Sequence, residues 1–504
     1  MKKKNHESCG NYLVNHIDWH QLATLYRQRH VKERLKESST NYQDRNLGIP
    51  VAPAHLTLRR YQHQAVANWL ENKGRGTLKM ATGSGKTIIA LAIAQELYQQ
   101  IGLQVLLIVC PTQHLVSQWS RECQKFNLQP IIAMMGGNNW QGELSNQLYA
   151  LQSNSQSNSQ NSTSSFLTII TTNATLIGDG FQSQLKYFPA KTLIVGDEAH
   201  NLGSTVIESC LPRNIGLRLA LSATPERQYD ELGTEAILSY FGAILQPEFT
   251  LADAIKQGAL ARYLYYPIFV ELTTAEALAY AQLTKKIGWT LNKNPSFQGN
   301  STLTALLNRR SRLIATAANK LTCLKELMTS RLNTSHTIFY CGDGYLDDDT
   351  RQIDAVTHLL GKELGYRVNT YTTDTSLEER ERLRSQFESG ELQGLIAIRC
   401  LDEGVDIPAI ATAVILASSS NSRQFIQRRG RILRPHPSKQ QATLFDTIVI
   451  PPNLERETWE VEKNLLRKEL RRFLTFAELA ENAEEATTQL LRLQERYQLR
   501  LGIG

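Results

Sequence analysis

The segment best suited to chemistry runs from Ala81 to Thr87 and reads ATGSGKT. A short run that predicts a strand precedes it, and the helical pattern IIALAIAQELYQQ follows it. Such a loop binds phosphate, because glycines let backbone N–H groups converge on oxygen atoms and the helix N-terminus adds partial positive charge. Lys86 would reach the outer phosphates of ATP, and the Thr87 hydroxyl would ligate Mg²⁺. The predicted nucleotide-binding residues of this loop are Thr82, Gly83, Ser84, Gly85, Lys86 and Thr87.

Two adjacent carboxylates end another predicted strand, in the segment TLIVGDEAH. Asp197 fits a role in organising Mg²⁺ through water, and Glu198 fits the residue that orients or deprotonates an attacking water molecule. Alone, an Asp-Glu pair after a strand is more often the start of a helix. Together with the phosphate-binding loop, the pair predicts hydrolysis of ATP.

The third candidate is a cluster of basic residues. Residues 423–434 read RQFIQRRGRILR and contain five arginines and no acidic residue. Clustered guanidinium groups repel one another unless an anion lies nearby. A solvated basic helix face is the alternative, but apolar residues stand among the charges, and we therefore expect an anion-binding role.

These residues need a framework, and the pattern of the chain predicts an α/β one. Short β-branched runs alternate with longer helical patterns in both halves, as in domains built on parallel sheets. The expected strands are 77–80, 105–110, 167–171, 193–195, 217–221, 337–341, 366–370, 395–398, 413–417 and 443–450. We therefore predict two tandem parallel-sheet domains, with a helical insert between them and a helical C-terminal tail. The expected boundaries are a basic helical extension over 1–55, a first domain over 56–245, a helical connector over 246–335, a second domain over 336–450 and a tail over 451–504.

Composition narrows the class of protein. The net charge is +7, and most of the excess lies in the first 60 residues, so charge alone is weak evidence for a nucleic-acid partner. The seven cysteines include no C-x-x-C pair, which argues against a zinc ribbon and suits a reducing cytosol. No apolar run reaches the length of about 20 residues needed to cross a bilayer. We expect a cytoplasmic protein with no membrane partner.

Several segments resemble the motifs of superfamily 2 helicases. DEAH at 197–200 and Ser222-Ala223-Thr224 resemble motifs II and III. The remaining motifs appear in the family's order: LRRYQ at 58–62 (Q motif), residues 110–119 (Ia), 169–175 (Ib), 338–340 (IV), LDEGVDIP at 401–408 (V) and QRRGRILR at 427–434 (VI). The resemblance covers about residues 56–450 and implies two RecA-like domains that use ATP and Mg²⁺.

The resemblance also implies roles for residues outside the phosphate-binding loop. Gln62 would bind adenine, and Arg431 and Arg434 would be arginine fingers that complete the γ-phosphate site across the domain cleft. The other catalytic and nucleotide-contacting positions implied are Gln427, His200, Gly404 and Asp406. His200, Ser222 and Thr224 would link the nucleotide site to the nucleic-acid site, and nucleic-acid backbone would lie against Thr112, Thr172 and Arg399.

The residues within these motifs favour DNA over RNA as the substrate. LRRYQ, PT followed by QW, and QRRGRILRP resemble the repair and restriction branch of the DEAH-box helicases, whereas RNA helicases of the DEAD-box type have PTREL where this chain has Pro111 through Leu115. The chain also resembles helicases of bacterial defence systems, one of which is the helicase-like restriction component of DNA phosphorothioation systems. An RNA helicase or remodeller and an ATP-gated nucleic-acid-binding scaffold are the alternative functions. A nuclease or modification-system protein is the expected protein partner, because no nuclease constellation stands out in either end of the chain.

Overall fold

The computed structural model describes residues 13–33, 48–136, 139–156, 166–227, 230–293, 301–346, 349–372, 374–398, 407–417, 429–450, 467, 470 and 473–497. The chain divides into two compact units, Met1–Ala254 and Ile255–Gly504. Each unit contains a six-stranded sheet in which every pair of neighbouring strands is parallel. The predicted α/β fold with tandem parallel sheets is confirmed.

The first unit places its strands in the order β1-β6-β5-β2-β4-β3. Their bounds are β1 (Arg75–Lys79), β2 (Val105–Cys110), β3 (Pro130–Ala133), β4 (Leu167–Thr172), β5 (Thr192–Asp197) and β6 (Leu217–Ser222). Every residue of β2, β4, β5 and β6 is buried. Such burial explains the nearly continuous apolar runs, because a parallel sheet has helices on both faces.

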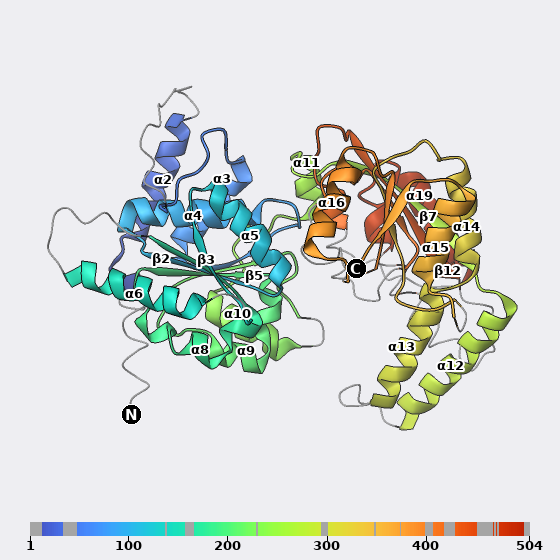
Figure 1. Ribbon diagram of the computed structural model, residues 1–504, viewed down its shortest axis with the longest axis horizontal. Helices are drawn as coiled ribbons and strands as arrows, with labels where there is room; N and C mark the ends of the chain where they lie inside the picture. Colours follow the sequence, from blue (N-terminus) through green and yellow to red (C-terminus); the bar gives the residue numbers. More distant parts are fainter. Residues whose placement is uncertain are drawn as a thin grey trace. The chain divides into compact units, whose positions relative to one another are not determined.

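Helices cover both faces of the first sheet, as Figure 1 shows, with α3, α4 and α5 on one face and α6, α8, α9 and α10 on the other. The bounds of the helices in this unit are α2 (Trp19–Glu33), α3 (Arg60–Glu71), α4 (Lys86–Ile101), α5 (Gln113–Lys125), α6 (Trp140–Gln156), α7 (Asn173–Leu176), α8 (Asp179–Gln182), η1 (Leu185–Tyr187), η2 (Ala199–Gly203), α9 (Thr205–Cys210), α10 (Glu231–Phe241) and α11 (Leu251–Lys256). A core that includes Ile169, Ile194 and Tyr240 fills the space between the sheet and these helices.

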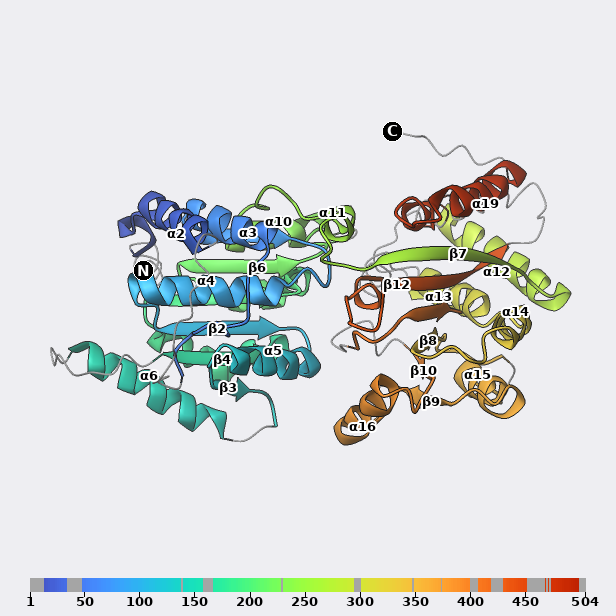
Figure 2. The same ribbon diagram turned by 90° about the horizontal axis from the view of Figure 1, so that it is seen from above.

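The second unit repeats this design with the strand order β7-β12-β11-β8-β10-β9. The strands are β7 (Arg262–Glu271), β8 (Thr337–Tyr340), β9 (Val368–Tyr371), β10 (Gly394–Ala397), β11 (Thr412–Ile415) and β12 (Gln441–Ile450). The helices are α12 (Thr274–Lys293), α13 (Ser301–Ala315), α14 (Asn319–Thr329), α15 (Gln352–His358), η3 (Leu359–Glu363), α16 (Leu377–Glu388) and α19 (Ala483–Arg496). Figure 2 shows β7 and β12 as the long neighbouring strands of this sheet. Its core centres on residues such as Phe339, Ile396 and Val414.

The region 246–335, which we expected to be helical, contains a ten-residue strand. β7 pairs with β12 along its whole length. Its sequence RYLYYPIFVE is rich in aromatic and apolar residues, and the side chains of Tyr263 and Tyr265 are fully buried. The rest of the region is mostly helical, as predicted. Within it, α12 and α13 pack against each other as a hairpin that extends away from the sheet (Figure 1).

In the part of the chain that the structure describes, no helix combines the length and the apolar composition that crossing a bilayer requires.

Candidate functional site

The strand order of the first sheet brings three of the predicted motifs to one edge. β1 lies beside β6, and β6 lies beside β5. The segments that follow these three strands are 80–87, 198–203 and 223–227. Because parallel strands end at the same edge of a sheet, the phosphate-binding loop, the carboxylates and the Ser-Ala-Thr segment collect there, where open α/β sheets bind ligands.

The loop between β1 and α4 has the backbone that its glycines predict. Gly83 and Gly85 have φ angles of +85° and +83°, in the left-handed region. At Gly85 the backbone therefore calls for glycine, and a Cβ atom there would also displace the side-chain amide of Gln62. Lys86 is the first residue of α4, and its Nζ donates to the carbonyls of Met80 (3.0 Å) and Ala81 (3.3 Å). The ammonium group therefore lies directly over the loop.

Two buried hydroxyls in this loop suit an anionic ligand. Thr82 Oγ1 and Ser84 Oγ are inaccessible to solvent and have no hydrogen-bond partner among the described residues. Leaving a buried hydroxyl unpaired is unfavourable, and the loop also ends at the N-terminus of a sixteen-residue helix. A nucleotide phosphate supplies the acceptors that these groups lack. The residues present therefore fit ATP, with the half-buried Thr87 next in the chain.

Gln62 contacts the loop from α3. Its Oε1 accepts from the Arg59 N–H (2.8 Å), and its Nε2 approaches the Ser84 carbonyl (3.3 Å). The neighbouring Tyr61 donates its hydroxyl to the same carbonyl (2.6 Å). The predicted adenine-binding residue thus lies at the phosphate-binding loop with its amide oriented by the start of its own helix.

The two carboxylates differ in how firmly they are held. Asp197 Oδ2 accepts from the indole Nε1 of Trp119 (2.8 Å), and its Oδ1 accepts from the Glu198 N–H (3.0 Å). Glu198 adopts a left-handed conformation with φ of +44° and is partly exposed. Burial, aided by the negative charge of Asp197, raises the pKa of the adjacent Cys110 thiol well above its ordinary value. Asp197 is therefore preorganised, and Glu198 has access to a water molecule.

A short series of contacts joins Glu198 to the segment after β6. His200 Nδ1 lies 3.5 Å from Glu198 Oε2 and 3.3 Å from Ser222 Oγ. Ser222 Oγ also accepts from the Thr224 N–H (3.1 Å). The structure therefore brings together His200, Ser222 and Thr224, the three residues predicted to link the two sites.

Some residues that shape this site were not predicted. Trp119 orients Asp197, and Arg227 donates from its guanidinium to the His200 carbonyl. Trp119 lies in a segment that the sequence analysis singled out, but only the fold shows that its indole reaches Asp197, 78 positions away. Tyr61 stands next to the predicted Gln62, whereas Arg227 belongs to no predicted motif.

The predicted nucleic-acid contacts lie at the same edge, after β2 and β4. Thr112 begins α5, and its buried Oγ1 has no hydrogen-bond partner among the described residues. Thr172 begins α7, and its Oγ1 accepts from the Thr175 N–H (3.2 Å) and lies 3.0 Å from the Thr175 hydroxyl. The Thr172 hydroxyl therefore stabilises local structure. Arg399, the third residue, lies outside the described residues.

In the second unit, only part of the predicted arginine cluster is described. Arg429 and the buried Arg431 lie in the short helical segment 429–432, and the half-buried Arg434 comes after it. Arg429 stacks on the Phe476 ring at 3.7 Å, and burial lowers the pKa of its guanidinium to about 10. The predicted residues that lie outside the described part of the chain are Gly404, Asp406 and Gln427.

Comparison with known proteins agrees with this arrangement. Residues 55–227 match the family described as the res subunit of type III restriction enzymes, and residues 319–436 match the helicase conserved C-terminal domain. The chain is 28% identical to the DNA 3'-5' translocase XPB2 of Sulfurisphaera tokodaii, over 82% of this chain and 87% of that protein. It is 24% identical to the DNA 3'-5' helicase XPB of Kineococcus radiotolerans, over 79% of this chain but only 61% of that protein.

Among solved structures, the ATP-dependent Type ISP restriction-modification enzyme LlaBIII bound to DNA has a similar fold, with a TM-score of 0.55 and 16% identity. The match covers 87% of this chain and 33% of that enzyme. At this identity the likeness concerns the fold alone.

Proposed function

Because the chain belongs to the superfamily 2 helicases of the restriction and repair type, we propose that it is a DNA-dependent ATPase that moves along or unwinds DNA. The observation that carries the proposal is the meeting of the phosphate-binding loop with Asp197 and Glu198 at one edge of the first sheet. The names of the DNA translocase and DNA helicase relatives support DNA as the polymer.

In this proposal, each predicted ATP-site residue of the first unit has a role. The loop from Thr82 to Thr87 holds the phosphates of ATP, with Lys86 as the counter-charge. Thr87, and Asp197 through water, would hold Mg²⁺, which would supply positive charge beside the phosphate oxygens. Glu198 orients the attacking water molecule and accepts its proton. Gln62 binds the adenine ring.

The second unit supplies positive charge in this proposal. Arg431 and Arg434 neutralise the transferred phosphate as arginine fingers, a role that rests on the match of residues 427–434 to motif VI and in which Gln427 takes part. Gly404 and Asp406 contact the nucleotide from motif V. ATP then favours a closed arrangement of the two units, and hydrolysis releases it.

The coupling to DNA uses the contact series at the first sheet. Thr112, Thr172 and Arg399 bind backbone phosphates, which supply most of the sequence-independent affinity for nucleic acid. A change in the position of the Glu198 side chain is transmitted to the segment after β6 through His200, Ser222 and Thr224. The biological setting that we propose is restriction, defence or repair, with a nuclease or modification-system protein as partner.

Steady-state ATP hydrolysis with duplex DNA, single-stranded DNA, single-stranded RNA or no polymer tests this proposal. We expect stimulation by DNA alone, and Glu198→Gln should lower kcat by about 100-fold or more because it removes the base. Glu235→Gln, on the exposed side of α10, is the matched control and should hydrolyse ATP as the wild type does.

Other outcomes lead elsewhere. Stimulation of ATP hydrolysis by RNA alone would identify RNA, instead of DNA, as the polymer on which the protein acts. Nucleotide binding without hydrolysis, with or without polymer, would leave the ATP-gated scaffold as the function.

A further inference from the structure

The last stretch of the first unit runs along its nucleotide-binding strand. We call residues 243–249 the strap. Backbone hydrogen bonds join the strap to β1: Thr77 N–H donates to Ala243, and Leu245 N–H donates to Thr77 (3.0 and 2.9 Å). Further along, the Phe249 N–H donates to the Lys79 carbonyl (3.1 Å). The strap thus lies on the side of β1 that β6 leaves open.

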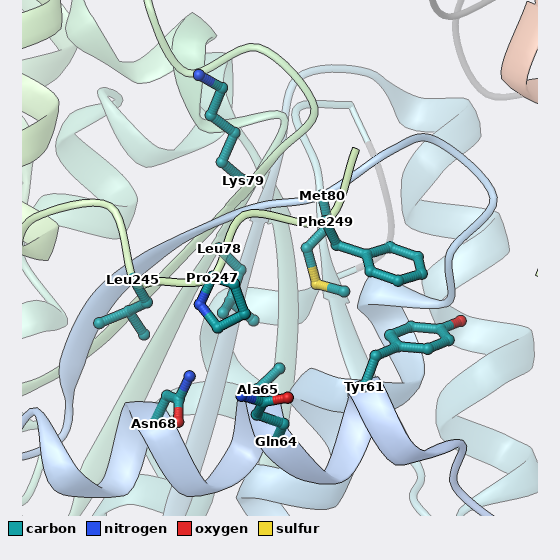
Figure 3. A pocket seen from close by; sticks show the side chains of 10 residues that line it. All are labelled: Tyr61, Gln64, Ala65, Asn68, Leu78, Lys79, Met80, Leu245, Pro247 and Phe249. Atoms are coloured by element: carbon teal, nitrogen blue, oxygen red, sulfur yellow. The ribbon is translucent and has the colours of Figure 1, made fainter. Parts of the chain in front are cut away.

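Phe249, the final residue of the strap, contacts the phosphate-binding loop by two routes. Its carbonyl accepts from the N–H of Ala81, the first residue of the loop (2.9 Å). Its ring stacks on Tyr61, with centroids 3.9 Å apart and ring planes 14° from parallel, as Figure 3 shows. The Tyr61 hydroxyl in turn donates to the Ser84 carbonyl in the middle of the loop (2.6 Å).

Both rings are buried and line a small pocket together with residues of α3, β1 and the strap, such as Ala65, Leu78 and Leu245 (Figure 3). Burial and the contact between the facing rings hold the pair together. Because closely packed side chains yield little, the stack gives a displacement of the loop a direct route to Phe249.

An ion pair at the same place adds the segment after β6. Lys79 Nζ lies 3.1 Å from Glu248 of the strap and 2.6 Å from Glu226, which follows Thr224 by two positions. Partial burial lowers the pKa of Lys79, but the hydrogen bonds and charges of the two carboxylates together outweigh it and raise the pKa, so the ammonium form is held. The strap is thus joined both to the phosphate-binding loop and to the segment that carries Ser222 and Thr224.

Directly after Phe249 the chain enters α11, the helix that spans the boundary between the two units. Thr250 and Asp253 hydrogen-bond reciprocally at the start of α11 (2.6–3.2 Å), and these bonds fix the first turn of the helix. The boundary between the units falls within α11, after Ala254. Two residues beyond the helix, Gly258 has φ of +66°, and a Cβ there would meet open space. The Gly258 N–H donates to the Ile255 carbonyl (3.0 Å), so a hydrogen-bonded turn that suits glycine follows α11.

From these contacts we infer that Phe249 is a positioning residue that couples occupancy of the phosphate-binding loop to α11, the segment through which the chain passes into the second unit. Phosphate binding moves the loop backbone at Ala81 and Ser84. The Ala81 N–H is hydrogen-bonded to the Phe249 carbonyl, and the Ser84 carbonyl is hydrogen-bonded to Tyr61, on which the Phe249 ring stacks. The inference rests on the proposed function for its nucleotide, ATP, but it does not require that the polymer be DNA.

Amide hydrogen exchange of the full chain, with and without Mg-ADP, tests the inference directly. In the wild type we expect nucleotide to slow exchange in residues 250–258 at least threefold as well as in the loop. Phe249→Ala should keep the protection of the loop and lose the protection of 250–258. Phe249→Tyr, which retains the ring, should restore it. A wild type in which nucleotide protects the loop but leaves 250–258 unchanged would overturn the inference.

ATP hydrolysis separates coupling from a loss of folding. Leu245→Ala removes an apolar side chain of the same strap at the end of the pocket far from Tyr61 (Figure 3), so it serves as the matched control. We expect Phe249→Ala to change the KM for ATP less than threefold but to reduce polymer-stimulated kcat at least fivefold, with thermal unfolding close to that of Leu245→Ala.

Equal losses of stimulated kcat in both variants would mean that the strap only stabilises the fold. If no polymer stimulates the wild type, the proposed function fails by itself, and the exchange measurement with nucleotide still decides whether Phe249 couples the loop to α11.

Discussion

Asp197 and Glu198 are neighbours in the chain, yet their surroundings give them different tasks. Asp197 accepts hydrogen bonds at both carboxylate oxygens, from Trp119 and from the Glu198 backbone. Glu198 has a left-handed backbone and is partly exposed, and its Oε2 lies 3.5 Å from Nδ1 of the buried His200. A fixed carboxylate suits the organisation of a hydrated Mg²⁺ ion, whereas a more accessible one suits proton transfer from water.

Replacing Trp119 by phenylalanine removes the indole donor and leaves Asp197 Oδ2 buried with one bond fewer. A buried charged acceptor that loses its partner costs about 1–3 kcal/mol, so we expect kcat for ATP hydrolysis to fall about 10-fold. Trp69→Phe is the control, because Trp69 is equally buried but donates to the Arg218 carbonyl away from the site. Equal kcat values for the two variants would show that the indole bond does not serve catalysis.

The residues that we propose to act on ATP could be predicted from the sequence, and those that position them could not. Lys86, Asp197 and Glu198 stand in contiguous motifs, because strand ends and loops place them locally. Phe249 lies far along the chain from Tyr61, and no local pattern marks two rings that stack. Such contacts depend on which strands become neighbours, and that is fixed by the whole unit.

The secondary-structure elements also divide into those that the local sequence specifies and those that depend on pairing with a distant segment. The ten expected strands all form, with ends shifted by a few residues, because β-branched apolar runs specify buried strands. β3 is only four residues long and begins at Pro130, so its signal is weak. β7 lies among helices, and its strand character comes from pairing with β12, more than 170 positions later.

At the base of the α12–α13 hairpin, Lys320 is a buried charge that makes stability depend on pH. Its Nζ donates to the carbonyls of Ala315 and Leu416, which joins the end of α13 to the end of β11. Burial lowers the pKa of Lys320 to about 7, against the opposing charges of Asp446 and Glu276. Above pH 7 the unfolded chain, with an ordinary lysine pKa, holds more protons than the folded chain, so the free energy of unfolding rises with pH.

Chemical denaturation at several pH values measures this effect. Relative to Lys320→Met, the wild type should gain about 1–2 kcal/mol in the free energy of unfolding between pH 7 and pH 8.5. The difference between the two proteins isolates Lys320, because burial also lowers the pKa of Lys439, to about 8, and that residue is present in both. Parallel curves for the two proteins would contradict the prediction.

The molecule as a whole consists of two units that each have a sheet and a hydrophobic core. All the described residues that we assign to the phosphates, apart from Arg431 and Arg434, belong to the first unit. ADP lacks the γ-phosphate that these arginines are proposed to neutralise, and the closed arrangement in which Gly404 and Asp406 would contact the nucleotide is proposed for ATP and not for ADP. The binding energy of ADP should therefore stabilise the first unit alone.

Urea denaturation should therefore show two transitions, and Mg-ADP should move only one of them. At about 100 times its dissociation constant, a ligand adds about 2.7 kcal/mol to the stability of the state that binds it. Lys86→Ala should abolish the shift, and Lys125→Ala, an exposed lysine on α5, should leave it intact. A shift of both transitions would mean that ADP is bound by residues of both units.

The pairing of β7 with β12 has a consequence for how the chain is made. Of the strands that the structure describes in the second unit, β7 is the first to leave the ribosome, and β12, its neighbour in the sheet, is the last. The first unit has all its strands, and its strap, before β7 is synthesised. Until Gln441 emerges, the aromatic edge of β7 has no strand to pair with, and an unpaired strand edge is prone to aggregation. Slow translation between residues 271 and 441 would lengthen that exposure, so the yield of folded protein should depend on chaperones that bind nascent chains.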